Sequence, residues 1–104
     1  MDKEMMDEFI GRTVVRHLKL EHNRNAGGAH RIHNRSHEGS LWIHSRPRLG
    51  VFTFETTGDV PSLLNSELTR RFGKNVSENS RGYKLWQVEN RKDVEEIITY
   101  WGQM

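Results

Sequence analysis

The sequence predicts one small α+β domain spanning residues 1–104, with a mainly antiparallel sheet of three to five strands packed against two or three helices. Its 104 residues suffice for one core but not for two. Residues 40–56 alternate apolar and polar side chains on both sides of a turn, which is typical of a β-hairpin. Apolar residues recur every three to four positions in residues 58–73 and 90–102, which is typical of amphipathic helices.

The first predicted element is a short amphipathic helix, because residues 5–10 place two Met, a Phe and an Ile three to five positions apart. Gly11 is its expected end. From Val14 the chain begins to alternate apolar and charged residues, which predicts a strand, with a helix continuing to about residue 19 as the alternative. Residues 29–34 predict a short edge strand, whose free edge could pair two chains into a homodimer.

The clearest prediction is the hairpin of residues 40–56, with a proline-containing turn at residues 46–49. We expect the core to receive Leu41, Ile43, Phe52 and Phe54. The opposite face then carries Trp42, His44, Arg46, Thr53 and Glu55. Such a set of side chains is unusual for a face that only contacts solvent.

The C-terminal half predicts a helix, a loop, a strand and a last helix. The first helix has Pro61 near its first turn, an apolar stripe of Leu63, Leu64, Leu68 and Phe72, and Gly73 as its stop. Residues 74–82 predict a loop and residues 83–88 a strand. The last helix has Asn90 as its N-cap, and we expect Val94, Ile97, Ile98 and Trp101 to face inward.

The composition excludes several classes of protein. No run of about 18 apolar residues is present and the first ten residues carry four acids, so we expect no membrane span or signal peptide and a cytoplasmic location. The absence of cysteine excludes disulfides, thiolate catalysis and cysteine-type zinc sites. No phosphate loop or other cofactor motif occurs, and we expect no cofactor.

Positive charge is concentrated in one segment. Residues 12–48 hold eight Lys or Arg against two acids, a net charge of +6, whereas residues 1–11 carry −3 and residues 49–104 carry −1. All six histidines lie in residues 12–48, four of them between residues 22 and 39 together with three Arg and three Asn. This composition predicts a basic loop at about residues 22–39, against which the acidic N-terminal helix could fold and partly neutralise it.

The charge segregation predicts a nucleic-acid-binding module that favours RNA or single strands slightly over duplex DNA, because no recognition helix carries the basic residues. Arginines would bind phosphates, amides would donate hydrogen bonds, and Trp42 with His44 would stack on a base. The predicted contacts are Arg16, Asn23, Arg24, Arg31, Asn34, Arg35, Trp42, His44, Arg46 and Arg48.

Two alternatives use the histidines differently. A metal-independent ribonuclease would need two histidines as base and acid, and His44, Glu55 and His33 are its candidates across the hairpin. A metal site would use His30, His33 and His37, although this segment would make a poor helix and nearby arginines oppose a dication. We expect neither, because histidines in basic segments more often bind than catalyse.

A third alternative is a protein-interaction or inhibitor module without activity of its own. Its acidic patches at residues 2–8 and 93–96 would meet a basic groove on a larger protein, or its arginines an acidic one. This alternative predicts little affinity for free nucleic acid.

Overall fold

The computed structural model describes residues 2–73, 76–78, 80 and 84–104. Within these ranges the helices and strands follow the order αββββαββα. In chain order they are α1 (Lys3–Val14), β1 (Leu20–Arg24), β2 (His30–Asn34), β3 (Ser40–Arg46), β4 (Val51–Thr57), α2 (Ser62–Phe72), β5 (Val76–Glu78), β6 (Lys84–Val88) and α3 (Arg91–Gln103).

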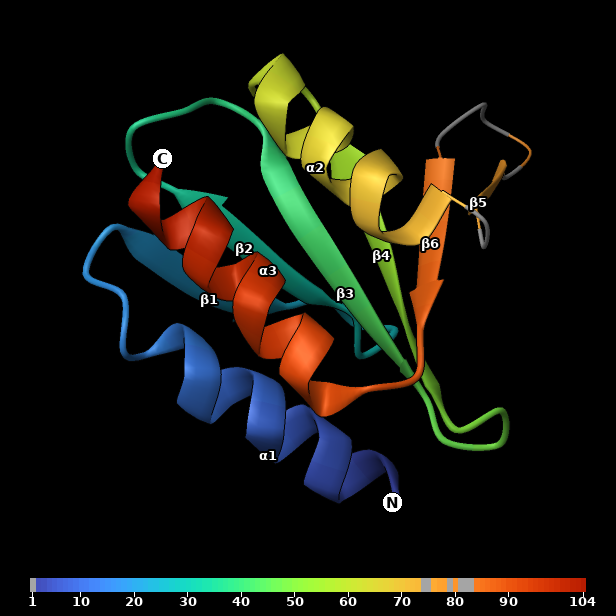
Figure 1. Ribbon diagram of the computed structural model, residues 1–104. Coiled ribbons are helices and arrows are strands. Elements are labelled where there is room, and N and C mark those ends of the chain that lie inside the picture. Colours follow the sequence, from blue (N-terminus) through green and yellow to red (C-terminus); the bar gives the residue numbers. More distant parts are fainter. Residues whose placement is uncertain (1, 74–75, 79, 81–83) are drawn as a thin grey trace.

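The strands form one antiparallel sheet in the order β1-β2-β3-β4-β6-β5 (Figure 1). The prediction of a small α+β fold with a mainly antiparallel sheet is confirmed, as is the presence of three helices. Over the described residues the sheet has six strands, one more than the upper limit that we predicted. Strand β5 accounts for the error, because it buries none of its three residues and so lacks the alternation that marks a half-buried strand.

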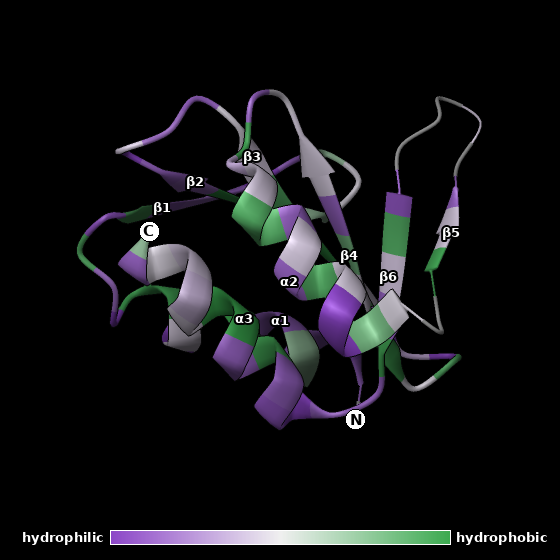
Figure 2. Ribbon diagram, turned by 45° about the horizontal axis from the view of Figure 1, so that its top comes forward, coloured by the Kyte–Doolittle hydropathy of each residue, from purple (hydrophilic) through white to green (hydrophobic). Residues whose placement is uncertain are grey.

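All three helices cover the same face of the sheet, where they form the core (Figure 1). The Phe54 ring lies 5.9 Å from the ring of Phe72 in α2, and the Trp101 indole in α3 donates a hydrogen bond of 3.0 Å to the Ile32 carbonyl. Hydrophobic and hydrophilic bands alternate along α2 and α3 in Figure 2, as one-sided burial requires. The other face of the sheet carries no helix among the described elements.

Helix α1 is longer than we predicted. Asp2 caps it by accepting a hydrogen bond of 2.8 Å from the Met5 amide, and the helix continues through Gly11 to Val14. The buried stripe explains the extension, because Thr13 and Val14 pack inward one turn beyond Ile10. The strand that we expected from Val14 begins only at Leu20, and the alternative of a helix reaching residue 19 is also wrong.

The segment predicted as a basic loop at residues 22–39 forms strands at eight of its 18 residues, 22–24 and 30–34. The β1–β2 hairpin takes up residues 20–34, with a tight turn at residues 25–29. Strand β2 lies between β1 and β3, so the prediction of an edge strand at residues 29–34 is wrong. Homodimer formation through a free edge of this strand is therefore excluded as well, since both of its edges are already paired.

The hairpin of β3 and β4 agrees with its prediction, and the four apolar residues expected in the core are at most 2% exposed. Helix α2 begins after Pro61, but Leu63 is 63% exposed and does not belong to the buried stripe. Strand β5 lies inside the segment predicted as a loop, and Tyr83, predicted to start the next strand, lies outside the described residues.

Helix α3 forms as predicted. The Asn90 side chain caps it by accepting a hydrogen bond of 2.8 Å from the Lys92 amide. Its inward stripe is fully buried and consists of Val94, Ile97, Ile98 and Trp101. Of the helices that the structure describes, none has the length and apolar character needed to cross a membrane.

Candidate functional site

The helix-free side of the sheet, called here the open face, holds the residues that point away from the core on β1, β2, β3, β4 and β6. Strand register places one residue of each strand in a single row across this face: Asn23, Arg31, Trp42, Glu55 and Leu85. Residues paired across antiparallel strands have Cβ atoms about 5 Å apart, so Arg31 and Glu55 flank the Trp42 indole. The sequence predicted Asn23, Arg31 and Trp42 as contact residues, and strand pairing aligns them.

Hydrogen bonds to neighbouring side chains orient the two central residues of this row. The half-buried Trp42 indole donates a hydrogen bond of 2.8 Å to the Thr57 hydroxyl, and the Arg31 guanidinium donates one of 2.9 Å to the Ser40 hydroxyl. The Arg31 bond has a neutral acceptor, so the positive charge of Arg31 is not neutralised by it. An oriented indole beside an unneutralised guanidinium can stack on a planar ring and bind an anion attached to it.

His44 and Glu55 approach each other on the open face, as predicted for the hairpin. The His44 Nε2 atom lies 3.5 Å from a carboxylate oxygen of Glu55. Burial of the ring, together with the positive charge of Arg46, lowers the pKa of His44 below its usual 6.5 despite the opposing influence of Glu55. His44 is therefore neutral at pH 7 and acts there as a hydrogen-bonding group rather than as a cation.

The third residue of the predicted catalytic set does not join this pair. His33 pairs with Ser40, which lies four residues along β3 from His44, or about 13 Å at the rise of an antiparallel strand. Its Nδ1 atom lies 3.2 Å from the Gly39 carbonyl oxygen. The set of His44, Glu55 and His33 is thus not assembled as one acid–base site.

The predicted metal site is not assembled either. His30 faces the helices and His33 the open face, because neighbouring residues of a strand point to opposite sides. The His37 ring stacks on Trp101 with ring centroids 5.5 Å apart. Across the described residues no group of three or more His, Asp or Glu side chains could hold a metal ion.

On the helix-covered side, Asp7 of α1 organises a buried polar network. One carboxylate oxygen of Asp7 accepts hydrogen bonds from His30 Nε2 at 2.7 Å and from the Ser45 hydroxyl at 2.9 Å. The other oxygen lies 3.0 Å from the Arg24 guanidinium and 3.5 Å from the Lys3 ammonium. The acidic helix thus folds against the basic segment and neutralises part of it, as the charge distribution suggested.

The network continues from His30 to His22, whose Nε2 lies 2.6 Å from His30 Nδ1. Burial tends to raise the pKa of Asp7, but the bonds from His30 and Ser45 outweigh it and the pKa lies below 3.8. Burial lowers the pKa of both histidines, and for His30 it outweighs the bond to Asp7. Neutral His30 has one N–H, which Asp7 accepts, so His22 must donate to His30 Nδ1.

Four of the predicted contact residues lie away from the open face or are neutralised. Asn34 is fully buried. Its side-chain NH2 group donates a hydrogen bond of 2.7 Å to the Trp101 carbonyl, and its side-chain oxygen accepts one from the Ser36 backbone amide. Its predicted role in binding is wrong. Ion pairs hold the other three: Arg16 with Glu95, Arg24 with Asp7, and Arg35 with Glu21.

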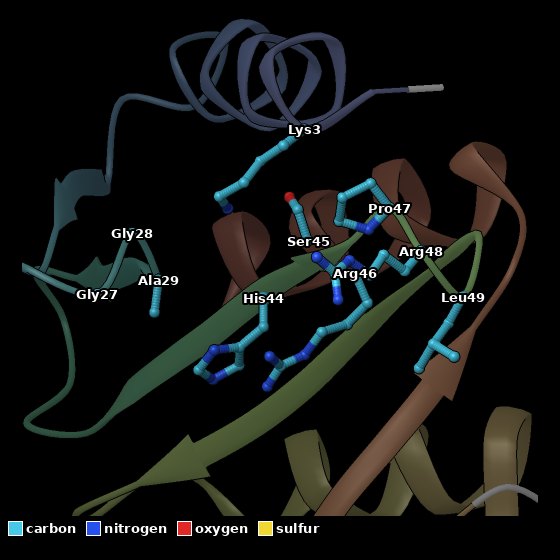
Figure 3. Close-up of a pocket in the computed structure, with 10 residues that line it drawn as sticks. All are labelled: Lys3, Gly27, Gly28, Ala29, His44, Ser45, Arg46, Pro47, Arg48 and Leu49. Atoms are coloured by element: carbon cyan, nitrogen blue, oxygen red, sulfur yellow. The ribbon is translucent and has the colours of Figure 1, made fainter.

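The remaining two predicted residues, Arg46 and Arg48, lie at a pocket of about 460 Å³ beside the end of β3, called here the edge pocket (Figure 3). Its lining comes from α1, from the β1–β2 turn and from the β3–β4 turn. The lining residues are Lys3, Gly27, Gly28, Ala29, His44, Ser45, Arg46, Pro47, Arg48 and Leu49.

The sequence predicted His44, Arg46 and Arg48 as contact residues, but not the pocket that they line. The two glycines were a further local signal, since consecutive glycines allow a close approach of the backbone. Lys3 lies nine residues before the basic segment and Leu49 directly follows it, and no periodicity of the sequence connects either residue with the pocket. Comparisons of the chain with protein-family models, with curated proteins and with solved structures found no match.

Proposed function

We propose that the protein is a nucleic-acid-binding module whose open face binds single-stranded RNA or DNA. One observation carries this proposal: Trp42 lies on a helix-free sheet face, directly between Arg31 on β2 and Glu55 on β4. An indole stacks on bases of any sequence, and a guanidinium beside it binds the neighbouring phosphate. Duplex DNA is the poorer fit, because its stacked bases are not accessible to a side chain on a flat sheet.

Additional support comes from the residues that surround this row. Asn23 adds an exposed amide on the same face, and the neutral ring of His44 offers a hydrogen-bonding edge two residues from Trp42. Arg46 extends the positive charge along β3. Each of these groups suits a flexible, single-stranded ligand that presents phosphates and base edges together.

The test is a titration of the purified protein with fluorescently labelled eight-nucleotide single-stranded RNA, single-stranded DNA and duplex DNA at 50 and 200 mM salt. We expect binding that weakens with salt and is tightest for the single strands. Trp42→Ala should weaken it about 5- to 150-fold, because stacking contributes about 1–3 kcal/mol per base. Trp42→Phe keeps an aromatic ring and should retain most of the affinity.

Arg16→Gln is the matched control, because Arg16 is paired with Glu95 away from the open face and its loss removes the same charge. Equal weakening by Arg16→Gln and Arg31→Gln would show that only net charge matters and would contradict the proposal. Absence of binding to every oligonucleotide at 50 mM salt would reject it in favour of a protein-binding module.

The same samples, run on a denaturing gel with and without chelator, test the ribonuclease alternative. The 3.5 Å approach of His44 to Glu55 favours this second candidate, although His33 is too distant to complete it. Chelator-resistant shortening of RNA that disappears in His44→Gln would establish cleavage. Intact RNA would leave binding as the activity.

A further inference from the structure

The edge pocket exists because β3 is longer than the strand beside it. The pairing of β2 with β3 ends at His30 and Ile43, whereas the pairing of β3 with β4 continues to Arg46 and Val51. Beyond Ile43, β3 therefore has a partner strand on one edge only. The edge pocket occupies the position that a longer β2 would fill.

A tight turn forms the wall opposite β3. The Asn25 side chain accepts a hydrogen bond of 2.8 Å from the Ala29 amide, and Gly28 adopts a left-handed conformation with a φ of 84°. A Cβ atom at Gly28 would lie 3.5 Å from the side chains of Lys3 and Arg24. The turn thus stays close to α1 without a side chain at this position.

The lining of the edge pocket is cationic. The Lys3 side chain extends from α1 toward it, and the side chains of His44 and Arg46 lie side by side on β3 (Figure 3). Arg48 adds a third permanent charge from the β3–β4 turn, and no carboxylate lines the edge pocket. Among the described residues, neither Arg46 nor Arg48 forms an ion pair, so their charges are available to a ligand.

The lining also has an apolar part, formed by Ala29, Pro47 and Leu49. Leu49 is 70% exposed, so its side chain is accessible to a ligand in the edge pocket. A ligand that fits both the cationic and the apolar part of the lining carries a concentrated negative charge attached to a group with a flat apolar surface. The volume of about 460 Å³ lies within the range of small-ligand pockets, about 300–1,000 Å³.

We infer that the edge pocket binds the terminal phosphate of a single-stranded nucleic acid, with the attached nucleoside against Pro47 and Leu49. This inference rests on the proposed function and specifies its ligand. A terminal phosphomonoester carries a charge of about −1.5 to −2 at pH 7, whereas an internal phosphodiester carries one negative charge, so the two unpaired arginines of the edge pocket favour the strand end. Trp42 lies on the same face of β3, two residues (about 7 Å) from His44 and four residues (about 13 Å) from Arg46, where it can stack on a base further along the strand.

The experiment compares the affinities of one eight-nucleotide single-stranded RNA with a 5′-phosphate, with a 3′-phosphate and with hydroxyls at both ends, at 50 mM salt. We expect one phosphorylated end to bind at least about 10-fold more tightly than the hydroxyl form. The double variant Arg46→Gln/Arg48→Gln should abolish this preference, and both replaced residues are exposed, so folding should be unaffected. Arg16→Gln is the control for net charge and should keep the preference.

A competition experiment identifies the group that the edge pocket selects. Nucleoside monophosphate should displace the phosphorylated RNA at lower concentration than inorganic phosphate, because it also contacts the apolar wall. Unphosphorylated nucleoside should not displace it. Equal competition by inorganic phosphate and nucleoside monophosphate would overturn the assignment of the nucleoside to Pro47 and Leu49.

The failures of the two proposals differ. Equal affinity for all three RNA ends, with the dependence on Trp42 retained, would overturn the terminal-phosphate inference and leave the open face as a binding surface. Binding of nucleoside monophosphate without binding of any oligonucleotide would overturn both the inference and the proposed function, and would make the edge pocket a small-molecule site.

Discussion

The two faces of the sheet divide the histidines and arginines of one basic segment into two groups with different roles. On the helix-covered side, His22, His30 and Arg24 form a network with Asp7, in which His30 is buried and Arg24 is half exposed. On the open face, Arg31 and His44 flank Trp42 with no helix above them. The comparison teaches that local composition shows how much charge a segment holds. The alternation of side chains along a strand decides which of the charged side chains a ligand can reach.

The largest expected effect is on the covered side. Asp7→Ala removes the acceptor of His30 and Ser45 and leaves two buried donors without a partner. We expect the free energy of unfolding to fall by about 2–3 kcal/mol, measured by urea denaturation at pH 7. Glu8→Gln removes a charge from an exposed position of the same helix and should change stability by at most about 0.5 kcal/mol. A cost for Asp7→Ala no larger than that of Glu8→Gln would show that the network is not structural.

Two asparagines test the comparison directly. Asn34→Ala removes the 2.7 Å hydrogen bond to the Trp101 carbonyl and the acceptor of the Ser36 amide, and should lower the free energy of unfolding by about 2 kcal/mol. Asn23→Ala, on the exposed end of the open-face row, should change stability by at most about 0.5 kcal/mol while weakening RNA binding. If Asn34→Ala weakened RNA binding in a folded protein more than Asn23→Ala did, the division between the faces would be wrong.

The pH dependence of stability tests the burial of histidines on the two faces of the sheet. Burial lowers the pKa of His22, His30 and His44 in the folded protein, so below pH 6.5 the unfolded chain takes up protons that the folded one does not. The free energy of unfolding should therefore fall as the pH decreases from 7 to 5, and fall further below about pH 4, because the pKa of Asp7 is also lowered.

Urea denaturation across this pH range measures the change in stability, and NMR titration of the histidine rings measures each pKa. All three rings should titrate below pH 6.5. A His30 ring that titrates above pH 6.5 would mean that the Asp7 carboxylate outweighs burial, and the contribution of His30 to stability would then rise on acidification.

The smallest expected effect separates two arginines of the basic segment. Arg31→Gln should weaken RNA binding a few-fold and reduce the slope of log affinity against log salt by about 1. Arg24→Gln should leave this slope unchanged, because Arg24 is already paired with Asp7. Fluorescence anisotropy at four salt concentrations measures both slopes, and equal slopes for the two variants would contradict the assignment of Arg31 to phosphate.

The sequence predicted those helices and strands that bury one side and expose the other. The alternation in residues 40–56 identified β3, β4 and their four core residues, and the spacing in residues 90–102 identified α3 with its cap at Asn90. Strand β5 lacked this signal and the start of β1 was placed too early, because edge strands with exposed side chains place little constraint on which residues they carry. Gly11 was misjudged as a helix end, since burial of the next turn outweighs the cost of one glycine.

The candidate site was predictable in part. Sequence reasoning found Trp42, Arg31 and the approach of His44 to Glu55, because period-two alternation and hairpin pairing are local properties. It mistook the buried Asn34 for a contact residue, because the residue's type does not reveal that Trp101, 67 residues away, receives its hydrogen bond.

By itself the sequence determined the α+β class, the core stripes and the concentration of cations in residues 12–48, since each depends on composition or on the period of a single element. Only the tertiary structure decided that Asp7 binds His30 and Arg24, and that Lys3 lines the same pocket as Arg46 and Arg48 at the end of β3. The physical reason is separation along the chain. These groups lie 17 to 45 positions apart in the sequence, and only the packing of α1 on the sheet brings them together.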